Sequence, residues 1–339
     1  MAELNTIVLS DLVRNASIIW LKAQAETPAV FRSSGLCKVT PIGMGTGNTR
    51  EFSSMDGEEY LSFKGEGDQA QRGKVQQGYT NIMYAVRQAK NISITWEAKN
   101  FNKYPELISR LTNSGAQGVN SIELDLTHRF TFGTATTYTD RDSRTVAIDT
   151  GDDLQLFYTA HLLKGAIGVT TYRNRLANNP RVSKGAIEGM ERLIVEETYN
   201  QFGELKPDMP FDIIWSGPDP NTVNTIREYL RSTASPDAAH AGVVNVYQGK
   251  YRHVILPKLA TTAAGGPDTT KRYYWGIASS TYSSMYLGIW EEPHLIPPQA
   301  NGNSEDSETD DLTFRQRACY GIVTVDAVFV KMSSGDGSA

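Results

Sequence analysis

The glycine-rich segment Gly43-Met-Gly-Thr-Gly-Asn48 is the first place where the sequence offers chemistry. Glycine-rich loops bind phosphate groups when they follow a strand, open a helix and carry a Lys-Ser or Lys-Thr pair. Neither the pair nor the change from strand to helix is present here. The glycines therefore favour a turn at the start of a β-hairpin over a nucleotide-binding loop.

Acidic and imidazole side chains are the other candidates for catalysis or metal binding. Asp149, Asp152 and Asp153 lack the alternating spacing and the distal glutamate of a calcium loop, so we predict a turn. No GxSxG motif supports a Ser-His-Asp triad. The five histidines have no metal-binding spacing and are interpreted as structural: His128, His161, His240, His253 and His294. We therefore expect a protein that is not an enzyme, with no catalytic residue, metal or cofactor.

The net charge, the cysteines and the hydropathy of the chain argue against further classes of protein. The net charge of -5 argues against a protein that grips nucleic acid through its phosphates. Lys271-Arg-Tyr-Tyr-Trp275 is favoured as a strand with an exposed basic edge over a base-stacking surface. Cys37 and Cys319 lack CxxC partners, so we expect reduced thiols rather than a zinc site or a disulfide framework. No apolar run suits a membrane span and no secretion signal is present, so we expect folding in a cytosol.

A long, mostly polar β-hairpin runs from Gly43 to Glu97. Its return half alternates between Ile82 and Val86 as a strand does, and glycine and charge crowd its tip. A two-stranded ribbon of this length is marginal in water and has no core of its own. We predict that a neighbouring subunit completes it, which points to assembly rather than to catalysis.

Helical and strand periods divide the rest of the first half into alternating elements. Before the hairpin we predict a helix over 4–25 and an extended link over 30–41. After it we predict a long helix over 105–130, whose middle is weakened by Gly115 and Gly118. Short strands over 138–141 and 145–148 follow.

The second half predicts an α/β unit. Ser183 is a helix N-cap, residues 211–215 form a buried strand, and Asp219 caps a helix that begins at Pro220. The other predicted elements are a hairpin of 243–247 and 251–256, strands over 273–278 and 286–290, a loop over 291–311 with an acidic patch at 305–311, strands over 312–331 broken at Gly321, and a frayed tail over 333–339.

This order of elements, together with several local stretches, resembles the major capsid protein of tailed bacteriophages, which has the HK97-type fold. Glu66-Gly-Asp68 resembles the tip of the family's extended loop, the E-loop. Asp149-Thr-Gly-Asp-Asp-Leu-Gln-Leu-Phe-Tyr-Thr-Ala-His161, followed by Asn174-Arg-Leu176, resembles a segment of many such head proteins. Phe211-Asp-Ile-Ile-Trp-Ser-Gly-Pro218 resembles the axial-domain strand, and Thr313-Phe-Arg-Gln-Arg-Ala-Cys-Tyr-Gly-Ile322 resembles the terminal strand that returns to the peripheral domain.

The resemblance implies an α+β, HK97-like capsid fold. Its expected parts are an N-terminal arm (1–42), an E-loop hairpin (43–97), a peripheral domain with a long spine helix (98–182), an axial α/β domain (183–300), and a C-terminal return strand with a tail (301–339). The E-loop tip residues implied to make contacts between subunits are Lys64, Glu66, Asp68, Arg72 and Lys74.

The implied function is a major capsid protein. Copies would form pentamers and hexamers of an icosahedral phage head, assembled in the host cytoplasm and located in the virion, that encloses double-stranded DNA and contacts it non-specifically. No segment resembles a fused scaffold, so a separate scaffolding protein is expected, along with a portal, a possible cement protein and no membrane. The alternatives are an encapsulin-like protein nanocompartment and a phage tail or accessory head protein.

Overall fold

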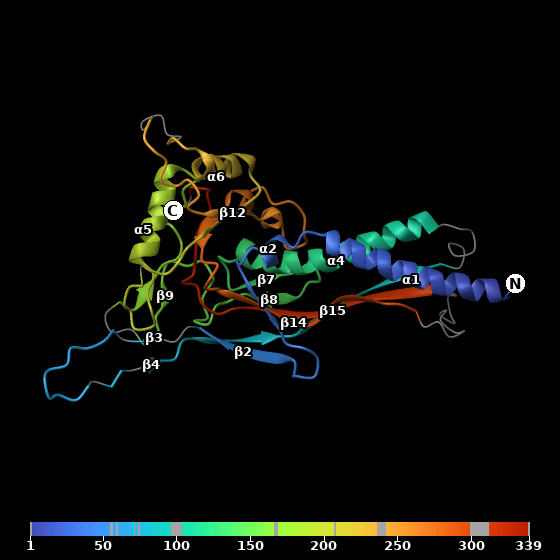
Figure 1. Ribbon diagram of the computed structural model, residues 1–339, viewed down its shortest axis with the longest axis horizontal. Helices are drawn as coiled ribbons and strands as arrows, with labels where there is room; N and C mark the ends of the chain where they lie inside the picture. Colours follow the sequence, from blue (N-terminus) through green and yellow to red (C-terminus); the bar gives the residue numbers. More distant parts are fainter. Residues whose placement is uncertain are drawn as a thin grey trace.

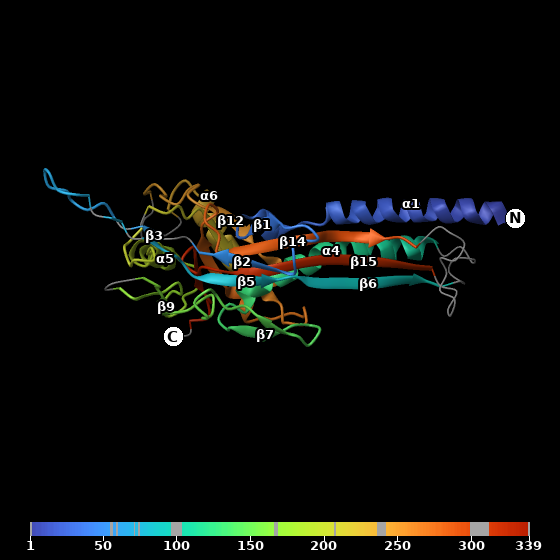
Figure 2. The same cartoon turned by 90° about the horizontal axis from the view of Figure 1, so that it is seen from below.

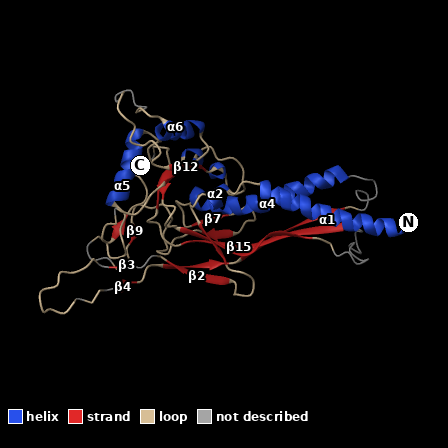
Figure 3. Cartoon of the chain, viewed as in Figure 1, coloured by secondary structure: helices blue, strands red, loops and turns tan. Residues whose placement is uncertain are grey.

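The computed structural model of the protein contains two four-stranded sheets, several two-stranded pairs and an extended hairpin that leaves the body at one end (Figures 1 and 3). The predicted α+β fold class is thereby confirmed. The structure describes residues 2–54, 57–58, 60–70, 72–73, 75–95, 104–165, 169–206, 208–235, 242–298 and 312–337.

The first sheet has the strand order β1-β14-β15-β6, with β1 parallel to β14 and the other pairs antiparallel. Its strands are β1 (Lys38–Pro41), β14 (Met285–Ile296), β15 (Leu312–Thr324) and β6 (Val86–Ile94). The long helix α4 (Tyr104–Thr131) packs on this sheet, and α1 (Ala2–Glu26) packs on α4 and extends past its end (Figure 2). Both predicted helices, over 105–130 and 4–25, are confirmed.

Two glycines let other elements approach the backbone of α4 closely. A Cβ atom at Gly115 would lie 2.5 Å from the carbonyl oxygen of Trp20, and one at Gly118 would lie 2.4 Å from Gln316 Nε2. The glycines that weaken the sequence signal for a helix are therefore the points at which α1 and β15 contact it.

The second sheet has the order β12-β11-β13-β16, with β12 parallel to β11 and the other pairs antiparallel. Its strands are β11 (Ile213–Ser216), β12 (Arg252–Ile255), β13 (Trp275–Ala278) and β16 (Val330–Ser333). Helices α5 (Lys184–Glu196) and α6 (Pro220–Arg231) pack on it. Ser183 and Asp219 cap them as predicted, accepting hydrogen bonds from the backbone N–H groups of Ala186 and Thr222.

One hydrophobic core joins the two sheets. Phe130 of α4 lies at its centre, with its ring centroid 5.1 Å from that of Phe31, 5.5 Å from Phe157 and 5.0 Å from Trp215. Since Trp215 belongs to β11, this cluster fixes the second sheet on the C-terminal end of α4.

The remaining elements are short. They are α2 (Val30–Ser33), β2 (Thr49–Ser53), β3 (Gly57–Glu58), β4 (Val75–Gln76), β5 (Thr80–Tyr84), β7 (Thr137–Thr139), β8 (Thr145–Ala147), β9 (His161–Leu162), β10 (Thr171–Tyr172) and the 3₁₀ turns η2 (Pro257–Ala260) and η3 (Lys271–Tyr273). Strands β7 and β8 match the two short strands predicted over 138–141 and 145–148.

The predicted hairpin of 243–247 and 251–256 is wrong. Strand β12 pairs with β11, and residues 243–247 form a bend, an isolated bridge from Val244 to Ala234 and a turn instead of a strand. The reason is local: the Asn245 side chain donates to the carbonyl oxygens of Tyr229 and Ser232 and so ties this segment to the end of α6.

Other boundaries also differ from those predicted. The link over 30–41 contains the one-turn helix α2, and the 273–278 strand begins only at Trp275, after η3. Strand β15 continues through Gly321 without a break. The tail is ordered at least to Gly337, whose N–H donates to the carbonyl oxygen of Asn179 at 3.0 Å.

Strand β14 pairs in the first sheet, with β1 and β15, although it lies within the range 183–300 expected for the axial domain. We therefore propose that this second unit ends before Met285. Strand β16, from the C-terminal range, completes the second sheet, so the last segment of the chain returns to both units.

The close packing at Gly115 gives a first prediction. In the Gly115→Ala variant the added methyl group meets the Trp20 carbonyl, so the free energy of unfolding should fall by about 1–3 kcal/mol despite the higher helix propensity of alanine. Denaturant unfolding measures the change. Gly185→Ala in α5 is the matched control, because nothing lies within 4 Å of an added Cβ there. Equal effects at the two positions would contradict the α1–α4 packing.

Candidate assembly surface

The extended hairpin, called the arm below (residues 43–95), is fixed to the body at its root. The root consists of β2 and β5, which pair antiparallel from Thr49↔Tyr84 to Ser53↔Thr80. It starts at the Gly43–Asn48 turn, where Gly43, Gly45 and Gly47 all have positive φ angles. This is the conformation that glycine adopts most readily, and the turn interpretation of the segment holds.

A pair of glycines forms a socket for the root. Met83 of β5 is fully buried, in a cluster with Trp290, Val323 and Val325. Gly288 and Gly321 lie opposite each other in the β14–β15 register. A Cβ atom would lie 2.4 Å from Met83 Sδ at Gly288 and 2.7 Å from Met83 Cγ at Gly321. The glycine expected to break the last strand therefore makes room for the arm.

Further along the arm, Tyr60 contacts a turn that follows α5. Its hydroxyl donates to the carbonyl oxygen of Leu205 at 2.9 Å, and the Lys206 ammonium lies 4.5 Å from its ring centroid. These contacts hold the arm at the edge of the body, close to the point where its tip leaves.

The tip, residues 61–70, 72 and 73, projects beyond the body (Figure 1). Leu61 and Phe63 are 101% and 98% exposed. The charged residues Lys64, Glu66, Asp68 and Arg72 are exposed as well, and none of them forms an ion pair with another described residue. Lys74 lies outside the described residues. The structure thus brings the described charged tip residues together at one end of the molecule.

Sequence reasoning missed the two apolar tip residues. The signal was present in Tyr60-Leu-Ser-Phe63, where two apolar side chains alternate with serine in an extended segment without a core. Isolated exposed apolar residues are normal, whereas a fully exposed pair on a projecting segment is a candidate interaction site. The apolar pair, and not only the charged residues beside it, forms the candidate assembly surface.

Other exposed apolar side chains lie away from the tip. Ile18 and Leu21 are on the face of α1 opposite the buried Trp20. Val243, Val244 and Val246 follow α6 in the chain.

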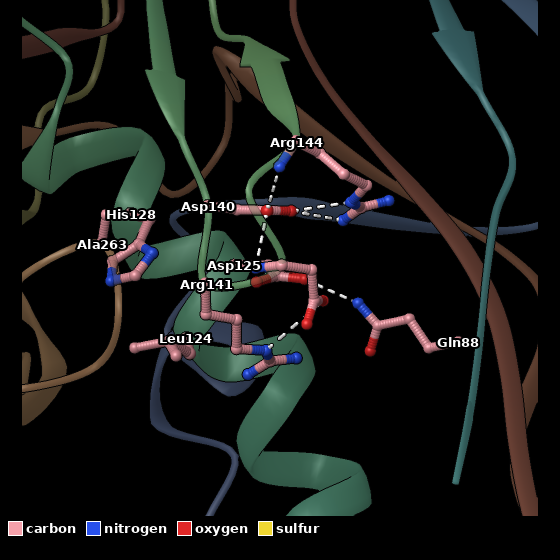
Figure 4. Close-up of a pocket in the computed structure, with 9 residues that line it drawn as sticks. Gln88, Leu124, Asp125, His128, Asp140, Arg141, Arg144 and Ala263 are labelled. Atoms are coloured by element: carbon pink, nitrogen blue, oxygen red, sulfur yellow. Dashed lines mark hydrogen bonds and ion pairs between the residues drawn. The ribbon is translucent and has the colours of Figure 1, made fainter.

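A polar pocket beside α4 is lined by several ionisable side chains, which form hydrogen bonds and ion pairs with one another and with their neighbours (Figure 4). Asp125 Oδ2 accepts hydrogen bonds from Gln88 Nε2 and from the Tyr320 hydroxyl. Asp140 accepts from Arg144 Nε at 2.8 Å. Burial, followed by the nearby charge of Lys271, lowers the pKa of His128 to about 4. The pocket has the character of a structural network.

The other chemistry-bearing side chains are likewise engaged in the fold. His253 Nε2 lies 2.9 Å from Ser216 Oγ, and burial raises the pKa of the Cys37 thiol to about 12. Asp152 points inward to His161 instead of forming a cation loop with Asp149 and Asp153. Among the described residues no three His, Cys, Asp or Glu side chains are grouped to hold a metal ion. His240 lies outside the described residues. None of the described helices has the length and hydropathy that crossing a membrane requires.

A buried lysine ties β16 to the segment before and after α5. Lys331 is fully buried, and its ammonium donates to the carbonyl oxygens of Glu197 at 3.0 Å and Arg173 at 3.4 Å. Burial lowers its pKa to about 7, although the Glu197 carboxylate favours the charged form.

No family model and no curated protein matches the sequence. Solved structures that match include Gordonia phage Cozz, at 12% identity and a TM-score of 0.47, covering 90% of this chain and 86% of that chain. The virus-like particle from Pyrococcus furiosus matches at 12% identity and 0.47, covering 94% and 98%. The mature capsid of bacteriophage PhiM1 matches at 13% and 0.47, covering 88% and 85%. At these values the matches carry no argument about function.

The arrangement of elements agrees with the HK97-like fold that the sequence resemblance implied. An N-terminal helix, an extended hairpin, a long helix on a sheet, an α/β unit and a returning strand follow one another in the expected order. The E-loop corresponds to the arm, and the spine helix corresponds to α4.

The glycine socket gives a second prediction. Met83→Ala should lower the free energy of unfolding by about 2–5 kcal/mol, because it removes a fully buried side chain and leaves a cavity. The matched control is Met44→Ala in the turn at the start of the arm, where the side chain is 67% exposed and the change should be within about 0.5 kcal/mol. Denaturant unfolding compares the two. A small effect at Met83 would show that the root is not seated as described.

The buried lysine gives a third prediction. An unfolded lysine has a pKa of about 10.4, so between pH 7 and pH 10 the unfolded chain binds more protons at Lys331 than the folded chain does. Lys331 should therefore contribute a rise of stability with pH across that window, and Lys331→Met should remove this contribution. Unfolding curves between pH 6.5 and pH 10 measure it. Lys90→Met, at an exposed position of β6, is the control that should keep the full rise, and an unchanged slope in Lys331→Met would refute the prediction.

Proposed function

We propose that this chain is the shell-forming protein of a phage-like capsid. The observation that carries the proposal is the arm, whose root is seated in the body while its tip presents Leu61 and Phe63 to solvent. Burying such side chains is worth about 1.5–3 kcal/mol each, and the described part of the chain offers them no cover. A second copy is the partner that supplies it, and the role is structural rather than enzymatic.

A contact between the tip of one copy and a different surface of the next is heterologous, and such contacts close into rings when the rotation between copies allows it. Rings of five and six subunits are the capsomers of an icosahedral shell. Each interface is weak alone, and many simultaneous contacts per subunit stabilise the closed shell.

The charged tip residues take the second role in this interface. We infer that Lys64, Glu66, Asp68, Arg72 and Lys74 form ion pairs with the adjacent subunit. Exposed pairs contribute about 0–1 kcal/mol each, so they adjust the register of the contact while the apolar pair supplies most of its strength.

The two sheet units and the N-terminal segment have separate places in the proposed shell. The unit of residues 183–284 lies around the fivefold and sixfold axes. Helix α4 and the sheet that contains β14 and β15 make the rigid peripheral part. Helix α1 packs on α4 of its own chain, and its exposed residues Ile18 and Leu21 face a neighbour or the shell interior.

The contents and partners belong to the same proposal. Double-stranded DNA is enclosed without sequence-specific contacts, which suits a chain with a net charge of -5. A separate scaffolding protein, a portal and a cement protein complete the head, which assembles in the host cytoplasm and ends in the virion.

Deletion of residues 60–74 gives a fourth prediction. The variant should remain a folded, soluble subunit, because the root keeps Met83 in its socket, but it should no longer form closed shells. Negative-stain electron microscopy after expression checks this. Normal shells from the deletion variant would refute the role assigned to the tip.

Point variants sharpen the same experiment. Leu61→Ser combined with Phe63→Ser should reduce shell yield at least tenfold with no change in the unfolding curve, whereas Ser62→Ala, between them, should assemble normally. Nuclease-protected DNA inside purified particles supports the phage head, protected protein cargo would indicate an encapsulin-like compartment, and rods or single rings would indicate a tail or accessory head protein.

A further inference from the structure

The segment of residues 149–165 supports the root of the arm. Asn81 Nδ2 of β5 donates to the carbonyl oxygen of Asp149 at 3.2 Å, and Lys164 Nζ donates to that of Gly78 at 3.1 Å. At Gly151 a Cβ atom would lie 2.7 Å from Tyr79 Cβ, so the two backbones meet closely there. Any displacement of this segment therefore moves the strand that carries the arm.

A fully buried histidine holds the segment together from inside. His161 Nδ1 lies 2.9 Å from Asp152 Oδ2, and Nε2 lies 3.2 Å from the carbonyl oxygen of Leu156. A carboxylate and a backbone carbonyl are both acceptors. A neutral imidazole donates from only one ring nitrogen, so the two contacts together require the doubly protonated imidazolium.

Asp152 is arranged as the matching anion. Burial alone would raise the pKa of its carboxyl group, but hydrogen bonding and the charge of His161 outweigh burial, and the pKa is lowered. The Thr150 hydroxyl donates to Oδ1, and the N–H of Leu162 donates to Oδ2 at 3.2 Å. The carboxylate thus joins both ends of the segment that supports the root.

The other titratable groups around the pair leave this charge arrangement in place. The Tyr172 ring stacks on His161 at 5.1 Å between centroids, and Tyr158 meets it edge-on at 6.1 Å. The Lys331 ammonium lies 5.7 Å from the centroid of the same Tyr172 ring. Two further groups act on the pair through their charge: Tyr79 faces Asp152, and Asp326, whose pKa is raised by burial, faces His161.

We propose that His161 is a positioning residue for the arm: as a buried imidazolium between Asp152 and Leu156, it fixes the 149–165 segment and through it the root. If the ring loses a proton, a nitrogen lone pair faces an acceptor and one of the two contacts becomes repulsive. These contacts of His161, called the clamp below, therefore hold only while Asp152 is ionised and the ring carries both of its protons. The consequence of the clamp for shell formation rests on the function proposed above.

The first test is the charge state of the ring. Nitrogen NMR of the full chain labelled at histidine should show both ring nitrogens of His161 protonated at pH 7, while His253 should show a neutral ring. His253 is the matched reference, because its serine partner can donate and burial lowers its pKa to about 4. A neutral His161 at pH 7 would overturn the proposal.

The second test is hydrogen exchange at the root. In unassembled chain at pH 7, His161→Gln should increase amide exchange of residues 78–82 at least tenfold, and His253→Gln should leave it unchanged. Unchanged exchange in a folded His161→Gln variant would overturn the clamp. If that variant does not fold, Asp152→Asn replaces it: exchange of residues 78–82 should again rise at least tenfold at pH 7, and unchanged exchange would equally refute the clamp.

Microscopy separates this inference from the proposed function. Faster exchange at the root in His161→Gln, together with normal shells, would leave the clamp standing and remove the arm from shell closure. No shells from the wild-type chain would overturn the proposed function while the exchange results still decide the clamp.

Discussion

Exposure of two apolar side chains on an anchored segment is the constraint on which the proposed assembly rests. Leu61 and Phe63 sit in water at the end of the arm, where each forgoes about 1.5–3 kcal/mol of burial. One copy cannot recover this free energy within the described part of its own chain. In the proposed shell a surface on a second copy recovers it, and repetition over many copies turns a weak contact into a stable closed assembly.

Anchoring the root makes that contact specific. The seat of Met83 between Gly288 and Gly321, the Tyr60 hydrogen bond to Leu205 and the support from segment 149–165 fix where the tip leaves the body. Groups that are already ordered lose less conformational entropy on binding, so a directed arm binds more tightly than a free one with the same side chains. The two-sheet body, joined through Phe130, supplies the rigid frame against which the arm is held.

Local signals in the sequence predicted most elements, and long-range contacts decided the rest. Helices α5 and α6 were predictable because Ser183 and Asp219 cap them within three residues, and α4 was predictable from its apolar spacing. The partner of β12, the ordered tail and the socket at Gly321 depend on residues distant in the chain, so no local pattern reports them. For the same reason the charged tip could be named from sequence, whereas the pairing of His161 with Asp152 appeared only as a turn and a lone histidine.

The most direct measurement of the central claim is hydroxyl-radical footprinting of Phe63 in assembled and dissociated protein. The account predicts rapid oxidation of this ring in the free subunit and at least fivefold slower oxidation after assembly. The oxidation rate of Tyr84, an exposed residue on the root, is measured in each state as the reference. Equal oxidation of Phe63 in both states, or a chain that stays monomeric at high concentration, would contradict it.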